Sequence, residues 1–363
     1  MHDGQEIRAP RRCEDLAAVG GVFRATDEDF RVDEVPLYEA SGDGEHVYLH
    51  FEKRGSTTPF AVSRIARSLG VSERDVGVAG LKDRHAVTTQ WISLPRVDPA
   101  RVEALDVEGV RVLSVARHRN KLRTGHLAGN RFTLVVRDAG AGAVERAEAI
   151  AARAVASGVP NYFGEQRFGR DGDNAARALA WLRGGPVPRD PQQRRFLVSA
   201  LQSSVFNVWL AARVRDGLLD RWVPGDLAMK GVGGRPWAID EATAADLYPR
   251  GAASASGPMF GRSMDRPGAE AGEREDSALE AAGVRRDDFD GAGPLAEGTR
   301  RVSRLFPTEF EVSARGDDVV LAFTLPPGCY ATVILAELGV DGAAGVAPAP
   351  RMEHPAPAPG GVD

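Results

Sequence analysis

Strand-like alternation of apolar and polar residues occurs near both ends of this chain and stops between them. Residues 44–53, 130–137 and 319–325 alternate in this way, and a period of two is typical of half-buried β-strands. From Pro160 to about Arg300 the pattern gives way to a glycine- and aromatic-rich loop, followed by a long amphipathic stretch. We therefore predict a strand-rich domain, made from both ends of the chain, that an inserted domain interrupts.

Helical spacing is found beside these strands. Ala61, Ile65 and Leu69 recur three to four residues apart, which predicts a helix with Thr58 as N-cap, Pro59 in its first turn and Gly70 at its end. The same spacing predicts further helices at 144–157, 199–216 and 331–338, and a further short strand at 90–94. The Ala/Pro/Gly-rich tail, 339–363, is expected to be disordered.

Composition limits the classes of protein that the chain can belong to. The 363 residues are 43% hydrophobic and 27% charged, which is typical of a globular protein with room for two domains. No run approaches 18 apolar residues, and residues 1–6 lack the features of a secretory signal, so we expect neither a membrane span nor export. The two cysteines, Cys13 and Cys329, form no disulfide framework or four-cysteine metal site. We expect a cytoplasmic protein.

Charge is distributed unevenly along the chain. The net charge is −5, yet residues 53–131 hold 15 Lys or Arg against 7 Asp or Glu, whereas residues 265–297 hold 4 Arg against 10 Asp or Glu. Binding depends on the local field rather than on the total. The run Arg117–Arg123 is the densest basic segment, so it is a candidate for gripping phosphate as well as an ordinary solvated face.

One carboxylate lies in an unusual setting within this basic half. Asp83 stands between Lys82 and Arg84, after a small-residue turn and before an apolar stretch. Flanking cations favour an ionised carboxylate, which can act as a nucleophile, as a base or as an anchor for a sugar. A surface turn with incidental charges is the simpler interpretation of the same segment.

Eight segments, taken together and in order, resemble the TruD family of tRNA pseudouridine synthases. They extend from about residue 23 to residue 338. The segments are Glu28-Asp29-Phe30-Arg31-Val32, Gly44-Glu45-His46, Ala79-Gly80-Leu81-Lys82-Asp83-Arg84-His85-Ala86-Val87-Thr88, Gly129-Asn130-Arg131-Phe132, Asn161-Tyr162-Phe163-Gly164, Gln166-Arg167-Phe168-Gly169, Ser199-Ala200-Leu201-Gln202-Ser203 and Leu325-Pro326-Pro327-Gly328-Cys329-Tyr330-Ala331-Thr332.

The resemblance implies an α+β fold. A pseudouridine-synthase catalytic domain, with a mixed, mainly antiparallel sheet flanked by helices, would comprise residues 15–159 and 301–338, and an inserted α/β TRUD domain would comprise 160–300. The implied activity is isomerisation of uridine, at position 13 of a tRNA, to pseudouridine. The implied partner is tRNA, without metal or organic cofactor, and we expect a monomer with no obligate protein partner.

The resemblance also implies site residues. Asp83 matches the catalytic aspartate, and Phe30, Asn130 and Tyr330 match positions that hold the target nucleotide, although the last is commonly Phe. Three further residues inside these segments are candidates for substrate contact: Lys82 and Arg84, which flank Asp83, and Phe132.

From the residues alone, several choices stay open. A uracil inside folded RNA must be flipped out and held by aromatic and polar side chains. Core packing, however, is the commoner role of aromatic residues near strands, such as Phe30, Phe132 and Tyr330. Asp83 can attack C1′, add to C6 of uracil or remove a sugar proton. The same chemistry on another RNA and a non-catalytic RNA-binding protein are the alternatives. A metal-dependent nuclease is disfavoured, because Asp83 has no acidic neighbour within seven residues.

Overall fold

The chain divides into two compact units in the computed structural model, which describes residues 9–23, 25–169 and 171–340. The first, here called the sheet unit, comprises Cys13–Gly158 and residues 305–340. The second, the helical unit, comprises Val159–Arg304 together with residues 9–12. Most of the tail expected to be disordered, from residue 341 to 363, lies outside the described residues.

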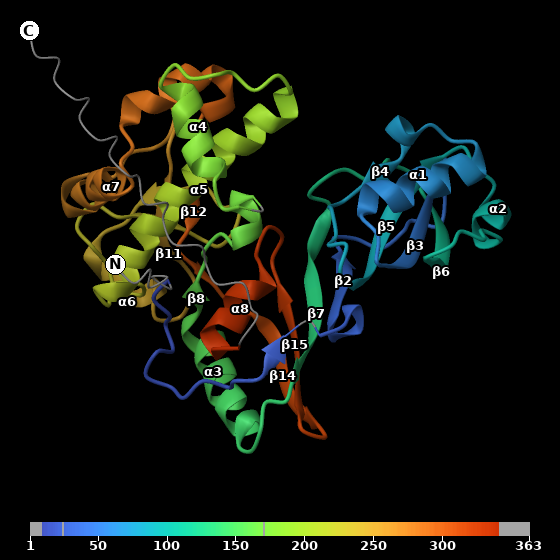
Figure 1. Ribbon diagram of the computed structural model, residues 1–363, viewed down its shortest axis with the longest axis horizontal. Helices are drawn as coiled ribbons and strands as arrows, with labels where there is room; N and C mark the ends of the chain where they lie inside the picture. The colour runs from blue at the N-terminus through green and yellow to red at the C-terminus, as the bar shows by residue number, and fades with distance from the viewer. Residues whose placement is uncertain (1–8, 24, 170, 341–363) are drawn as a thin grey trace, which may run out of the picture. The chain divides into compact units, whose positions relative to one another are not determined.

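The sheet unit is built on a mixed, mainly antiparallel sheet (Figure 1), in which only the pair β2–β5 is parallel among the described strands. The strand order is β14-β15-β7-β2-β5-β3-β6, with β1 paired to β7 and β4 to β5. The strands are β1 Val22–Phe23, β2 Phe30–Pro36, β3 His46–Arg54, β4 Gly77–Val78, β5 Val87–Pro95, β6 Val110–His118, β7 Leu127–Arg137, β14 Thr308–Arg315 and β15 Asp318–Leu325.

Helices cover the sheet at both ends. Helix α1 packs on β3 and β5, and α3 packs on β14 and contacts α8 (Figure 1). The helices of this unit are α1 Thr58–Leu69, α2 Pro99–Glu103, α3 Ala143–Ser157 and α8 Ala331–Leu338, with short 3-10 turns η1 Asp27–Asp29 and η2 Glu73–Asp75. The fold class expected from the sequence, α+β with a mainly antiparallel sheet, is therefore confirmed.

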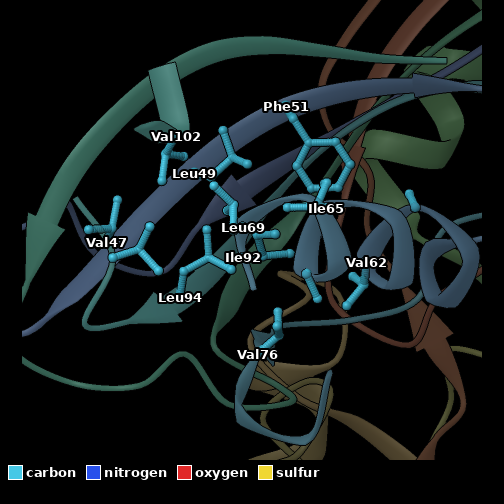
Figure 2. Close-up of a cluster of buried hydrophobic side chains, with 13 residues drawn as sticks. Val47, Leu49, Phe51, Val62, Ile65, Leu69, Val76, Ile92, Leu94 and Val102 are labelled. Atoms are coloured by element: carbon cyan, nitrogen blue, oxygen red, sulfur yellow. The ribbon is translucent and has the colours of Figure 1, made fainter. Parts of the chain in front are cut away.

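The apolar face of α1 supplies the core between this helix and the sheet. Ile65 and Leu69 of α1 meet Leu49 and Phe51 of β3 and Ile92 of β5, all at most 5% exposed (Figure 2). Burying one such side chain contributes about 1.5–3 kcal/mol. The helix periodicity of α1 and the strand periodicities of β3 and β5 therefore supply the two sides of one core.

The start of α1 differs from the sequence prediction by one residue. Thr57, rather than Thr58, is the N-cap, and its hydroxyl accepts a hydrogen bond from Phe60 N at 3.4 Å. The Thr58 hydroxyl instead makes two hydrogen bonds inside the sheet unit, with Gln90 and with Lys82 N. Gly70 ends the helix in the left-handed region, with φ of 73°, as predicted.

The helical unit contains a long central helix and a small sheet. Helix α5 packs on α4, α7 and β11, and the sheet has the order β10-β9-β11-β12. The helices are α4 Asn174–Leu182, α5 Pro191–Arg215, α6 Glu241–Leu247 and α7 Ala269–Ala281, with 3-10 segments η3 Glu165–Phe168 and η4 Arg286–Ala296. The strands are β9 Leu227–Met229, β10 Trp237–Ala238, β11 Ser254–Met259 and β12 Thr299–Val302; β8 Val159–Pro160 and β13 Arg304–Leu305 lie where the chain passes between the units.

Within the described residues, α5 alone is long and apolar enough to cross a membrane by length and composition. Its most apolar window is 72% buried inside the protein, which is the pattern of a core helix. It starts eight residues earlier than the sequence predicts, because Asp190 caps it by accepting a hydrogen bond from Gln192 N at 2.9 Å and Pro191 occupies its first turn.

Candidate active site around Asp83

The segment that carries Asp83 is a loop between β4 and β5, and the loop is fastened on both sides of this residue. Ala79 O accepts a hydrogen bond from Gly125 N at 2.8 Å. Lys82 N donates to the Thr58 hydroxyl at 2.9 Å, and Asp83 O accepts from Lys53 Nζ at 2.7 Å. The backbone around Asp83 is therefore held by β3, by α1 and by the segment before β7.

Thr58 links this loop to the central strand β5. Its hydroxyl accepts from Lys82 N and donates to Gln90 Oε1 at 2.8 Å. Both Thr58 and Gln90 are buried. A hydroxyl that makes one bond as acceptor and one as donor fixes the distance between the loop and the strand, so these two residues act as a spacer under Asp83.

Lys53 is a buried cation beside the Asp83 loop. The residue is 0% exposed, and its ammonium donates to Ser56 O and to Asp83 O, both at 2.7 Å. Burial lowers the pKa of Lys53 to about 8, opposed by the attraction of Asp83. The sequence interpretation missed Lys53, although a signal was present. It continues the alternation of Val47, Leu49 and Phe51, so it belongs to the buried face of β3.

Lys82 points into the sheet unit, where it joins a second polar group. Its Nζ lies 2.8 Å from Glu34 Oε2 and donates to Asn130 Oδ1 at 2.7 Å. The side chains of Lys82 and Glu34 are 5% and 1% exposed. Glu34 Oε1 also accepts a hydrogen bond from Trp91 N at 3.1 Å. Glu34 was another residue that the sequence interpretation missed; it follows Phe30 and Val32 on the buried face of β2.

The Lys82 contact determines which way the amide of Asn130 faces. An ammonium group only donates hydrogen bonds, so the atom that Lys82 meets must be the amide oxygen. The amide nitrogen of Asn130, with its two N–H groups, is consequently directed away from Lys82. Asn130 therefore offers donors rather than an acceptor to whatever occupies the site.

The strand register brings the ends of three strands together at Asn130. Glu34 of β2 and Leu325 of β15 are both register partners of Asn130 on β7. The neighbouring Gly129 allows this close approach, because a Cβ there would lie 2.6 Å from Leu325 O. The turn after β15 then leads to Tyr330, a partly exposed residue at the start of α8. Tyr330 therefore follows, five residues later, the end of β15 that pairs with Asn130.

Phe30 and Phe132, both candidates for substrate contact, are mostly buried. Their rings stack at a centroid distance of 6.2 Å, and Phe132 also stacks on Phe323 at 5.5 Å. The exposed fractions of Phe30 and Phe132 are 3% and 5%. These rings form an apolar row across β2, β7 and β15, on the same face as Glu34 and Asn130.

Of the remaining basic residues, Arg84 and Arg119 are exposed and Lys121 is partly exposed. Arg84 donates from Nε to Gly55 O at 3.4 Å, and Arg119 pairs with Asp43 at 2.8 Å. Arg119 holds the pKa of the Asp43 carboxyl below its usual range. Lys121 donates to Arg74 O at 2.9 Å. These contacts are made at the surface and leave the cations accessible to solvent.

Two further sequence segments that carry the resemblance meet inside the helical unit. Asn207 of α5 accepts a hydrogen bond from Phe163 N at 2.9 Å and donates to Phe163 O at 3.0 Å. Arg167 donates to the hydroxyls of Ser199 and Ser203. The loop 161–169 is thereby attached to α5, so these motif residues have a structural role in this unit.

No group of three or more His, Cys, Asp or Glu side chains suited to hold a metal ion occurs among residues 9–23, 25–169 and 171–340. The described site is instead made of one partly exposed carboxylate, two buried ammonium groups, one buried carboxylate and one amide, together with aromatic rings. Such a set can carry out acid–base or nucleophilic chemistry.

The chain is similar to known proteins over most of its length. The family model for tRNA pseudouridine synthase D (TruD) matches residues 7–184 and 186–338. A tRNA pseudouridine synthase D from Anaeromyxobacter dehalogenans (strain 2CP-C) is 48% identical over 89% of this chain and 94% of its own length. One from Thermus thermophilus is 42% identical over 91% of this chain and 92% of its own length.

A solved structure shows the same fold. The crystal structure of a protein described as tRNA pseudouridine synthase D (TruD), from Methanosarcina mazei, superposes with a TM-score of 0.70 at 26% identity, covering 89% of this chain and 94% of that one. The family match includes Asp83 and every other residue of the site described above. The chain belongs to the TruD family of tRNA pseudouridine synthases, isomerases that convert uridine in tRNA to pseudouridine.

Proposed function

We propose that this chain isomerises uridine 13 of a tRNA and that Asp83 is the catalytic carboxylate. The observation that carries the proposal is the fastening of the Asp83 backbone between Lys53 and the Thr58 hydroxyl. A catalytic group must be held within a fraction of an ångström of its working position. A surface turn with incidental charges has no need of a buried lysine beneath it.

The reaction requires the N1–C1′ bond of uridine to break and a C5–C1′ bond to form. C5 loses a proton and N1 gains one, so no other reactant is consumed. Attack by Asp83 on C1′, its addition to C6 and removal of a sugar proton by it are each compatible with this balance. In every case the buried ammonium group of Lys53, which donates to Asp83 O, supplies positive charge beside the reacting residue.

The other residues of the site recognise the base. The N–H groups of Asn130 donate to a carbonyl oxygen of uracil, because Lys82 occupies the amide oxygen. The apolar row of Phe30 and Phe132 borders the site, and the Tyr330 ring stacks on the flipped base. Lys82 positions Asn130 rather than gripping phosphate, whereas the exposed Arg84 can reach the RNA backbone.

These roles place the reaction in the sheet unit. We propose that residues 15–159 and 301–338, the range predicted from the sequence, form the catalytic domain. Residues 160–300 form the TRUD domain. We further propose that the protein acts as a monomer. The two buried, unbridged cysteines suit a reducing cytoplasm.

The experiment that tests the proposal is pseudouridine mapping across all RNA of cells that lack the protein. Loss of pseudouridine at position 13 of tRNA, restored by the wild-type chain but not by Asp83→Asn, supports both the site and the substrate. Loss at a position in another RNA instead shows the same chemistry on a different target. Restoration by Asp83→Asn shows that the protein acts as an RNA-binding protein and contradicts the catalytic role.

A further inference from the structure

Leu81 is conspicuously exposed for an apolar residue in a fastened loop. Its exposed fraction is 73%, the highest among the large exposed hydrophobic side chains of the described residues. Single exposed apolar residues are ordinary on protein surfaces. The position of Leu81, two residues before Asp83, is what makes this one different.

The exposure of Leu81 does not result from a loosely held backbone. On one side Ala79 O is bonded to Gly125 N, and on the other Lys82 N is bonded to the Thr58 hydroxyl. The Lys82 side chain is anchored on Glu34 and Asn130. With both neighbours fixed, the loop presents the Leu81 side chain outward.

Both Leu81 and Asp83 are accessible to solvent. Along the loop, Leu81 is exposed, Lys82 is buried and Asp83 is partly exposed. The Cα atoms of residues two apart are at most about 7 Å apart. A solvent-accessible apolar side chain therefore lies close to the carboxylate of Asp83.

We propose that Leu81 is the wedge that enters the base stack of the tRNA and fills the space left by the target uridine. A base that must be extruded leaves a gap in the stack, and proteins commonly fill such gaps with an apolar side chain. Leu81 would thus contact the stacked RNA bases next to the target nucleotide. The inference rests on the proposed catalytic role of Asp83.

The test measures extrusion separately from chemistry. A tRNA with 2-aminopurine on the 3′ side of the target uridine gains fluorescence when the stack opens. Both proteins carry Asp83→Asn, so that no product forms. Binding of the Asp83→Asn protein is expected to raise the fluorescence, and binding of the double variant Asp83→Asn with Leu81→Ala is expected to raise it far less. Leu81→Met, which retains an apolar side chain of similar size, is expected to restore the rise.

The rate of pseudouridine formation gives the second readout. Leu81→Ala is expected to lower the single-turnover rate by about 10- to 100-fold, because the cost of unstacking is no longer offset. RNA affinity should change less than about threefold. The defect should shrink on a tRNA with an abasic residue beside the target, where the stack is already weakened. Val155→Ala, which trims another exposed apolar side chain on α3, is the matched control and should leave both readouts unchanged.

Two results would overturn the wedge. One is an unchanged rate and fluorescence rise in Leu81→Ala. The other is a lowered rate with an unchanged rise and the same defect on the abasic substrate, which would mean that Leu81 only supports the loop. Neither result touches the role of Asp83, whose failure would show as product formation by Asp83→Asn alone. Unaltered thermal unfolding of Leu81→Ala confirms that the variant folds.

Discussion

At the scale of single residues, the site depends on two lysines that look alike in sequence and act differently. Lys53 holds the backbone of Asp83, whereas Lys82 holds the amide of Asn130. Both are buried, so each must have polar partners to offset the loss of hydration. Their partners, Asp83 and Asn130, are parts of the proposed site, so the stability of the sheet unit is coupled to the geometry of that site.

The buried ammonium of Lys53 predicts a pH dependence of stability. Its pKa is about 8 in the folded chain, because of burial, against 10.5 ordinarily. Asp83 and Asp27 oppose this shift and Lys82 adds to it. Between these two values the folded protein binds fewer protons than the unfolded one, so stability should rise with pH. Below about pH 8 both states hold the proton and the dependence disappears.

Thermal unfolding of the wild type and of Lys53→Met measures this effect. The difference between their unfolding temperatures should move in favour of the wild type from about pH 8 to about pH 10. Other titrating groups are common to both proteins and cancel in the difference. A difference that stays constant over this range would mean that Lys53 is not a buried charged amine.

The fixed amide of Asn130 predicts that kcat/KM depends on the carbonyl oxygen of uracil that accepts its hydrogen bond. Sulfur accepts hydrogen bonds weakly, so replacing the contacted carbonyl oxygen should lower kcat/KM by about 3- to 10-fold. The measurement compares tRNAs carrying uridine, 2-thiouridine or 4-thiouridine at the target. One of the two thio substrates should be impaired with the wild type, and Asn130→Ala should lose the discrimination. Equal discrimination by both proteins would exclude Asn130 as the reader of that oxygen.

Tyr330 predicts a contrast between two substitutions. If its ring stacks on the base, Tyr330→Phe should retain nearly all activity, because only the hydroxyl is removed. Tyr330→Ala should lose about 1–3 kcal/mol of nucleotide binding, the usual contribution of one base–aromatic stack. The comparison uses kcat/KM on one tRNA. A Phe variant as impaired as the Ala variant would show that the hydroxyl, and not the ring, is what matters.

At the scale of elements, periodicity is sufficient to predict type and approximate position. The helix at 331–338 is confirmed residue for residue, and the strand at 319–325 to within one residue. The short strand predicted at 90–94 extends over Val87–Pro95, because β5 is buried by neighbours on both sides and lacks clear alternation. The predicted N-cap of α1 is the wrong threonine, since two candidates adjoin and only tertiary contacts distinguish them.

The basic segment after β6 predicts an electrostatic contribution from one element. Arg119 is paired with Asp43 at the surface, and an exposed ion pair of this kind is readily exchanged for a phosphate. Arg119→Glu with Lys121→Glu should weaken tRNA binding and reduce the salt slope by about one unit for each phosphate that is no longer neutralised. Arg262→Glu with Arg266→Glu makes the same charge change in the helical unit and should have little effect. Unchanged affinity and slope in the first variant would leave this segment a solvated face.

At the scale of the whole molecule, the sequence is enough to predict the fold class and the catalytic candidate, but not the support beneath the candidate. Asp83 and Asn130 lie in segments that resemble a known family. Glu34 and Lys53 lie in strands whose alternation shows only that they are buried. Which charged groups meet depends on the pairing of β2, β5 and β7, which brings together residues nearly 100 positions apart. Register of this kind is a tertiary property that local patterns do not specify.

The most direct measurement is single-turnover formation of pseudouridine by Asp83→Asn on a tRNA that the wild type modifies. The substitution preserves the shape of the side chain and removes its charge and nucleophilicity. The expected rate is at least about 10³-fold below that of the wild type, with tRNA affinity within a few-fold. Asp75→Asn, which changes an exposed aspartate of the same unit, should retain full activity. More than a trace of product from Asp83→Asn would contradict the assignment of Asp83 as the catalytic residue.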